Sequence, residues 1–159
     1  MSTNSLRCIL RARSKYRDLP QSERAAFVLV VCVLIVVRLL LRLIPFRKAY
    51  DAVESISRFF SRRRLGSPSR VGAPAIARFV NAVADRLPIS TLCLPRALTA
   101  HVLLSAYGHS SQLRIGVAHA EGGAIRAHAW VESDGAIVMG DLPDLRSFQP
   151  LPVIGSKHR

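Results

Sequence analysis

The sequence has few cysteines and no arrangement of them that implies a disulfide framework. Cys8, Cys32 and Cys93 are odd in number, and they lack the Cys-x-x-Cys or Cys/His spacing of a zinc site. We therefore expect no metal and no cofactor, and a reducing, cytoplasmic setting. No internal repeat and no nucleic-acid-binding motif appears, so we do not expect a nucleic-acid partner despite the basic charge.

Acidic residues are scarce in the first part of the chain. Up to Arg70 there are 15 Lys and Arg against 4 Asp and Glu, whereas from Val71 onward there are 8 against 6. The net charge of +13 therefore divides into +11 and +2. A basic first part favours an anionic partner, such as a membrane surface, nucleic acid or an acidic peptide, and the remainder reads as a near-neutral globular unit.

Residues 20–44 are expected to form one long apolar helix, which Pro45 ends. Residues 25–44 are long enough to cross a bilayer, but Arg38 and Arg42 shorten the clean apolar run to 25–37. Arg24, Arg38 and Arg42 fall near one line of a helical wheel. This favours a helix lying on a core, a partner or a membrane surface, with a membrane span as the alternative.

The pattern divides the chain into four parts and predicts the α+β class. Residues 1–18 are a basic tail, 19–65 are helical, 71–145 form a compact core and 146–159 are a proline-punctuated, peripheral tail. Further helices are expected over 46–60, 74–87 and 94–107, and strands over 113–118, 124–132 and 136–141. The strands would form a small antiparallel sheet with the helix 94–107 packed on it.

The dipeptide Asp134-Gly135 predicts a two-residue hairpin turn, because both residues tolerate the positive φ that such turns need. Counting outward from this turn places His128 directly opposite Asp141, on one face of the sheet. A carboxylate beside a histidine can fix its tautomer and steady its charged form, as in a nucleophilic triad. Glu132 lies on the same face and is the backup carboxylate.

Cys93 is the candidate nucleophile. Pro95 is tolerated only in the first turn of a helix, so the helix begins right after Cys93. The N–H groups at a helix N-terminus favour a thiolate and can receive a developing oxyanion. A small buried apolar role for Cys93 is the alternative reading.

The motifs that carry chemistry resemble those of the lasso-peptide biosynthesis B proteins, in their stand-alone leader-peptidase form. The quoted stretches are Cys93-Leu94-Pro95-Arg96-Ala97, Leu113-Arg114-Ile115-Gly116-Val117, Ala127-His128-Ala129-Trp130-Val131-Glu132 and Asp141. The helical stretches Leu19 to Arg24 and Arg38 to Phe46 also look like that family's first part. The resemblance spans most of the chain, from Leu19 to Asp141, and the joint motif is specific.

The resemblance implies a transglutaminase- or papain-like core that removes the leader from a ribosomally made precursor. It carries a catalytic Cys–His–Asp triad over onto Cys93, His128 and Asp141. It also implies three partners: the lasso-peptide precursor, a separate leader-recognition protein and the lasso cyclase. Two other readings stay open, namely a transglutaminase-like acyltransferase and a non-enzymatic, membrane-anchored interaction protein.

Other side chains compete for roles at this site. His101, His109 and His119 are rivals of His128 for the general base, although none lies on so informative a strand. Trp130 is expected to project to the same side as His128, where it would wall the cleft or simply pack in the core. Contact with a membrane surface through residues 25–44 also remains an expectation.

Overall fold

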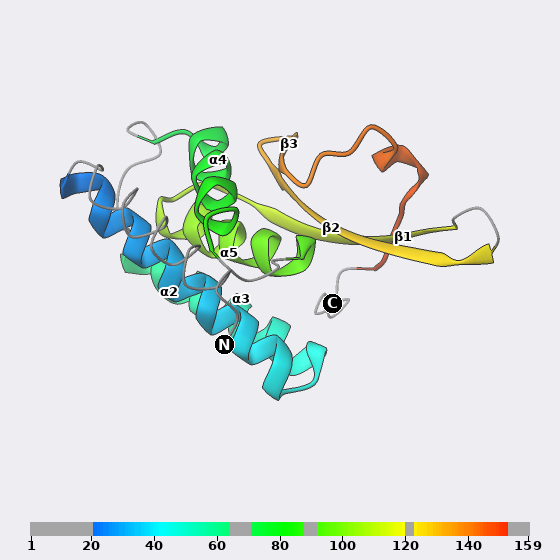
Figure 1. Ribbon diagram of the computed structural model, residues 1–159, viewed down its shortest axis with the longest axis horizontal. Coiled ribbons are helices and arrows are strands. Elements are labelled where there is room, and N and C mark those ends of the chain that lie inside the picture. Colours follow the sequence, from blue (N-terminus) through cyan, green and yellow to red (C-terminus); the bar gives the residue numbers. More distant parts are fainter. Residues whose placement is uncertain (1–20, 64–70, 88–91, 120–122, 153–159) are drawn as a thin grey trace, which may run out of the picture.

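The structure, a computed structural model, describes residues 21–63, 71–87, 92–119 and 123–152. Four helices come first in the described ranges: α2 (Gln21–Leu43), α3 (Phe46–Arg63), α4 (Ala73–Ala84) and α5 (Cys93–Ala106). Then follow β1 (Gln112–His119), β2 (Ile125–Ser133), β3 (Ala136–Met139), the short helix η2 (Leu145–Ser147) and β4 (Gln149–Pro150). The predicted α+β class is confirmed, with a helical first part before the sheet (Figure 1).

Helix α5 lies at the centre of the molecule. It packs against α2, α3 and α4 on one side and against β1 and β2 on the other (Figure 1). Ala97, Leu98 and Leu104 are completely buried, because neighbours cover the helix nearly all round. The predicted linker at 65–70 lies outside the described residues, but helices from both sides of it share one hydrophobic core with the sheet. The division into separate units stays a prediction.

The strands form one antiparallel sheet in the order β3-β2-β1-β4. The fourth strand was not expected, since residues 146–159 were predicted to be a peripheral tail. This prediction is wrong for 148–150: Phe148 is buried, Gly116 pairs with Pro150, and Val117 pairs with Gln149. The prolines of this segment argued against a strand in the sequence. The strand has only two residues and lies at a sheet edge, where proline is tolerated.

The sheet separates two apolar clusters. Leu113, Ala129, Val131 and Met139 belong to the main core with α5. On the opposite face, a smaller cluster contains the four buried residues Ala118, Trp130, Leu145 and Phe148. Because side chains alternate between faces along a strand, His128 lies with Trp130 on the second face.

A polar cluster crosses the interface between α3 and α5. His101 Nε2 donates a hydrogen bond to Glu54 Oε1 at 3.0 Å, and His101 Nδ1 shares one with Ser111 Oγ at 2.9 Å. The hydrogen bond from His101 holds the pKa of Glu54 below its usual value. Burial and the nearby Glu54 carboxylate raise the pKa of Tyr50 to about 12. These contacts stabilise the charged form of Glu54 in the folded state.

This cluster predicts an acid-sensitive contribution to stability. A carboxylate with a lowered folded-state pKa stabilises the fold above its ordinary pKa, and this contribution is lost as the pH falls through the lowered value. Glu54→Gln is expected to flatten the acid side of the pH–stability curve measured by urea unfolding. Asp51→Asn, which removes an exposed carboxylate from the same helix, is the control. An unchanged acid slope in Glu54→Gln would contradict this account.

The apolar helix expected near residues 20–44 is α2, and the break before α3 includes Pro45. Within the described ranges, no helix combines the length and the apolar character that a bilayer crossing requires.

Candidate active site

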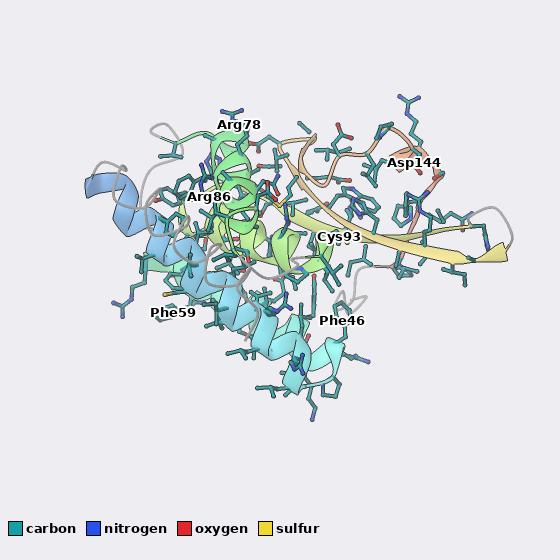
Figure 2. The ribbon with its side chains drawn as sticks, viewed as in Figure 1. Phe46, Phe59, Arg78, Arg86, Cys93 and Asp144 are labelled. Atoms are coloured by element: carbon teal, nitrogen blue, oxygen red, sulfur yellow. The ribbon has the colours of Figure 1, made fainter. Side chains whose placement is uncertain are left out.

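Cys93 is the first residue of α5, one residue before the helix start that Pro95 predicts. Leu92 precedes it with extended backbone (φ −67°, ψ 167°) and makes no side-chain capping hydrogen bond. Cys93 is partly exposed and packs against the main core. Figure 2 shows it at one end of α5, the helix that packs against strands β1 and β2. The thiol therefore lies at a helix N-terminus that no capping side chain of Leu92 occupies.

Arg96 ties this end of α5 to the end of α4. Its Nη2 lies 2.7 Å from Asp85 Oδ1, and its Nη1 donates to Asn81 Oδ1 at 3.4 Å. Asp85 is the residue that ends α4. These contacts hold the first turn of α5, and with it Cys93, against the neighbouring helix.

His128 lies on β2 in a largely aromatic environment. Its ring is stacked on that of Trp130, with 6.3 Å between centroids and 14° between planes, and it lies 5.6 Å from the ring of Phe148. His128 Nε2 donates a hydrogen bond of 2.7 Å to the carbonyl oxygen of Gly140. A carbonyl only accepts, so this bond assigns the proton to Nε2 and leaves Nδ1 as the acceptor of the neutral ring.

The hairpin that carries His128 confirms the predicted turn but not the whole predicted register. Asp134 and Gly135 have positive φ angles of 50° and 78°, and Ser133 pairs with Ala136 as predicted. A bulge then shifts the register, so that Val131 pairs with Met139. Because β3 ends there, the expectation that Asp141 pairs directly opposite His128 is wrong.

Asp141 is exposed and follows the end of β3. No hydrogen bond or ion pair links its carboxylate to His128 in the described part of the chain. The Gly140 carbonyl makes the tautomer-fixing contact that the sequence argument assigned to Asp141. The catalytic role of Asp141 stays a prediction.

Glu132, the backup carboxylate, is bound by other groups. Trp130 Nε1 donates to its Oε1 at 2.9 Å, and Arg114 Nε donates to its Oε2 at 3.2 Å. Trp130 is 4% exposed, so its ring is both packed in the second cluster and in contact with His128. The Trp130 indole therefore donates a hydrogen bond to Glu132 through Nε1 and stacks its ring on the His128 imidazole.

Gly116 leaves room for this indole. It pairs with His128 across β1 and β2, and a Cβ on Gly116 would come within 2.9 Å of the Trp130 ring. Gly116→Ala is therefore expected to displace the ring and to lower the free energy of unfolding by about 1–3 kcal/mol. Trp130 is the only tryptophan of the chain, so its fluorescence would report the displacement directly.

The control for this substitution is Gly72→Ala, where the nearest atom to the new Cβ is 3.8 Å away. It should leave the tryptophan spectrum unchanged, because the new methyl group has room and lies away from Trp130. Equal spectra for wild type and Gly116→Ala would mean that Gly116 does not position the ring.

The other described histidines have structural partners or lie at an edge. His101 bridges Glu54 and Ser111, and His109 Nε2 donates to the carbonyl of Val71 at 2.7 Å. His119 is exposed at the end of β1. The link between Glu54 and His101 joins residues 47 positions apart, and no sequence pattern marked it.

The three predicted triad residues are not joined to one another by hydrogen bonds in the described ranges. Cys93 packs with the core on the α5 side, whereas His128 lies on the sheet face of Trp130 and Phe148. The triad therefore stays a prediction. In the same ranges, no group of three or more His, Cys, Asp or Glu side chains is placed to hold a metal ion.

Comparison with protein families identifies the chain at a coarser level. Residues 31–153 match the family model of the transglutaminase-like superfamily. The chain belongs to the transglutaminase-like superfamily. No curated protein and no solved structure matches it. The match starts within α2 and ends beyond β4, so it covers helices and sheet together.

Superfamily membership supports cysteine hydrolase or acyl-transfer chemistry for this domain. The family match identifies neither the substrate nor the acceptor of the acyl group. In a transglutaminase-like domain, a cysteine that opens a helix packed on the sheet is the natural candidate for the nucleophile, and Cys93 has this position.

Proposed function

We propose that this transglutaminase-like protein is a cysteine peptidase that removes the leader from a lasso-peptide precursor. The observation that carries the proposal is Cys93 as the first residue of α5, in a chain of this superfamily. The joint Cys93, His128 and Asp141 motif adds the resemblance to the lasso-peptide B proteins. In this proposal a separate protein recognises the leader, and the lasso cyclase takes over the released core peptide.

The chemistry follows from the groups at these positions. His128 Nδ1 takes the proton of the Cys93 thiol, the resulting thiolate attacks the carbonyl carbon of the amide at the leader–core junction, and a thioester forms as the C–N bond breaks. His128 gives its proton to the leaving amine, and water then hydrolyses the thioester with His128 as base. His128 Nδ1 is the acceptor for this proton transfer, because Nε2 donates to Gly140. Asp141 would steady the charged imidazole.

The first turn of α5 supplies the donors for the oxyanion. The first N–H groups of a helix have no partner within the helix. Pro95 has no N–H group, so Cys93 and Leu94 provide the leading donors of this turn. Such donors, aimed at the developing negative charge, are the largest electrostatic contribution in acyl transfer.

The nucleophile and the base must meet for this mechanism to operate. In the structure, Cys93 packs on the α5 side of the sheet whereas His128 lies on the face of Trp130 and Phe148, so the mechanism requires these two segments to move relative to each other. We therefore expect the Cys93–His128 pair to form when the precursor is bound. A crosslink or a nuclear magnetic resonance contact between these side chains, seen only with precursor present, would support this step.

The test is mass spectrometry of the cognate precursor after incubation with the full protein and its leader-recognition partner. One cut at the leader–core junction supports the peptidase. Adding a primary amine separates the two chemistries, since a free carboxylate at the cut means hydrolysis and an amide of the added amine means acyl transfer. A precursor left intact under these conditions contradicts the proposal.

A further inference from the structure

Helix α2 has an exposed face that is largely apolar, with the exposed Arg42 beside it near its C-terminal end. Its residues are spaced three or four apart, so they share one side of the helix. Leu39 is 48% exposed and Leu43 is 74% exposed. We call the following six residues the exposed α2 face: Val28, Cys32, Ile35, Val36, Leu39 and Leu43.

The opposite side of α2 is already covered. Val30, Leu34 and Val37 are at most 2% exposed and lie against the other helices. From Phe27 to Val37, α2 is therefore apolar on its exposed side as well as on its buried side, which is typical of helices that are covered on every side. Helix α2 could not leave the core without uncovering these three side chains. A partner must therefore bind the exposed α2 face while α2 stays packed on the other helices (Figure 1).

The charges around this face select an anionic partner. No Asp or Glu occurs between Arg24 and Tyr50. Arg42, Arg47 and Lys48 are exposed at or just beyond the C-terminal end of α2. A second copy of the chain would bring the same basic rim, and two molecules of net charge +13 repel one another. Lipid headgroups of negative charge complement the rim, and acyl chains complement the apolar centre.

We propose that the exposed α2 face docks in the plane of a membrane surface that carries anionic lipid. In this arrangement the apolar side chains enter the boundary between headgroups and acyl chains. The basic side chains remain at headgroup level, where each adds to the attraction. The inference concerns a surface away from Cys93 and does not depend on the peptidase activity.

The first test is flotation of the full chain with vesicles of phosphatidylcholine, with or without phosphatidylglycerol. We expect binding to the anionic vesicles, weakened by salt. Ile35→Gln with Leu39→Gln should lower this binding by at least about tenfold. The matched control, Ile125→Gln with Ile137→Gln, removes two exposed apolar side chains on the sheet and should bind like wild type. Glutamine is well tolerated in helices, so α2 should remain folded.

A charge variant separates the two contributions. Replacing Arg42, Arg47 and Lys48 with glutamine should lower binding to anionic vesicles by roughly 100-fold, since each basic residue contributes about fivefold. Failure of the wild type to float would overturn the proposal. So would equal binding by the Ile35/Leu39 variant, because the basic tail alone would then account for it.

Cys32 offers a local readout, since its thiol is exposed on this face. With Cys8 and Cys93 replaced by serine, an environment-sensitive fluorophore on Cys32 should shift to the blue with anionic vesicles. The same fluorophore at Ser147→Cys, in a chain without the native cysteines, should not shift. An unshifted Cys32 probe would contradict docking of the exposed α2 face on the membrane. A dimer in sedimentation that the Ile35/Leu39 variant abolishes would show instead that a second copy of the chain covers this face.

Discussion

Replacing Cys93 with alanine is expected to lower the rate of precursor cleavage by about 10,000-fold or more, with little loss of stability. Removing a nucleophile eliminates the covalent route, and only binding and oxyanion stabilisation remain. Cys93 is partly exposed at the start of α5, so the smaller side chain leaves no large buried cavity. The measurement is single-turnover cleavage, followed by mass spectrometry, together with a urea unfolding curve.

Cys32 provides the matched control within the same chain. Cys32→Ala removes a thiol from α2 and should leave cleavage unchanged. Alkylation by iodoacetamide adds an independent comparison, because Cys32 is the more exposed of the two. Faster alkylation of Cys93 would then reflect the reactivity of its thiol and not its exposure. Undiminished cleavage by Cys93→Ala would remove Cys93 from the mechanism.

The local signals in the sequence were sufficient for most of the fold. Pro95 located the start of α5, Pro45 marked the end of α2, and Asp134-Gly135 located the turn between β2 and β3. Each is a backbone constraint that acts within a few residues, so it can be read without knowing the tertiary structure. These elements also placed Cys93 and His128 on a helix and a strand that pack together.

The details of the site depended on features that a local pattern does not encode. Counting from the turn assumed regular pairing, but the bulge between Val131 and Glu132 displaces Asp141 from the position opposite His128. Alternation gave the correct face for Trp130, yet that face is covered by Leu145 together with Phe148, which belongs to a segment expected to be peripheral. Both errors concern contacts between segments, which packing decides.

The bulge also gives Gly140 a role that the sequence did not reveal. Gly140 has φ of 78°, and its carbonyl receives the hydrogen bond from His128 Nε2. A Cβ at this position would lie 2.7 Å from the carbonyl oxygen of Ala129 and 3.0 Å from Trp130 Cα. Those are backbone atoms, which cannot rotate away as the end of a side chain can. The close approach of the two strands therefore requires glycine here.

Gly140→Ala is accordingly expected to lower the free energy of unfolding by about 2–5 kcal/mol. Of this, about 1–2 kcal/mol reflects an L-residue in the left-handed region, and about 1–3 kcal/mol reflects the steric overlap. The folded fraction should also lose cleavage activity, because relief of the overlap moves the carbonyl away from His128. Urea unfolding followed by Trp130 fluorescence gives the first quantity, and cleavage assayed where the variant is folded gives the second.

Gly135→Ala separates the backbone contribution from the steric contribution. Gly135 has the same φ of 78°, but a Cβ there would meet nothing within 4 Å. It should lower stability by about 1–2 kcal/mol and leave cleavage intact, since only the backbone preference is disturbed. A Gly140→Ala variant that matches Gly135→Ala in both measurements would show that β2 yields to the added methyl group. The Gly140 carbonyl would then not be what holds His128 in its reactive tautomer.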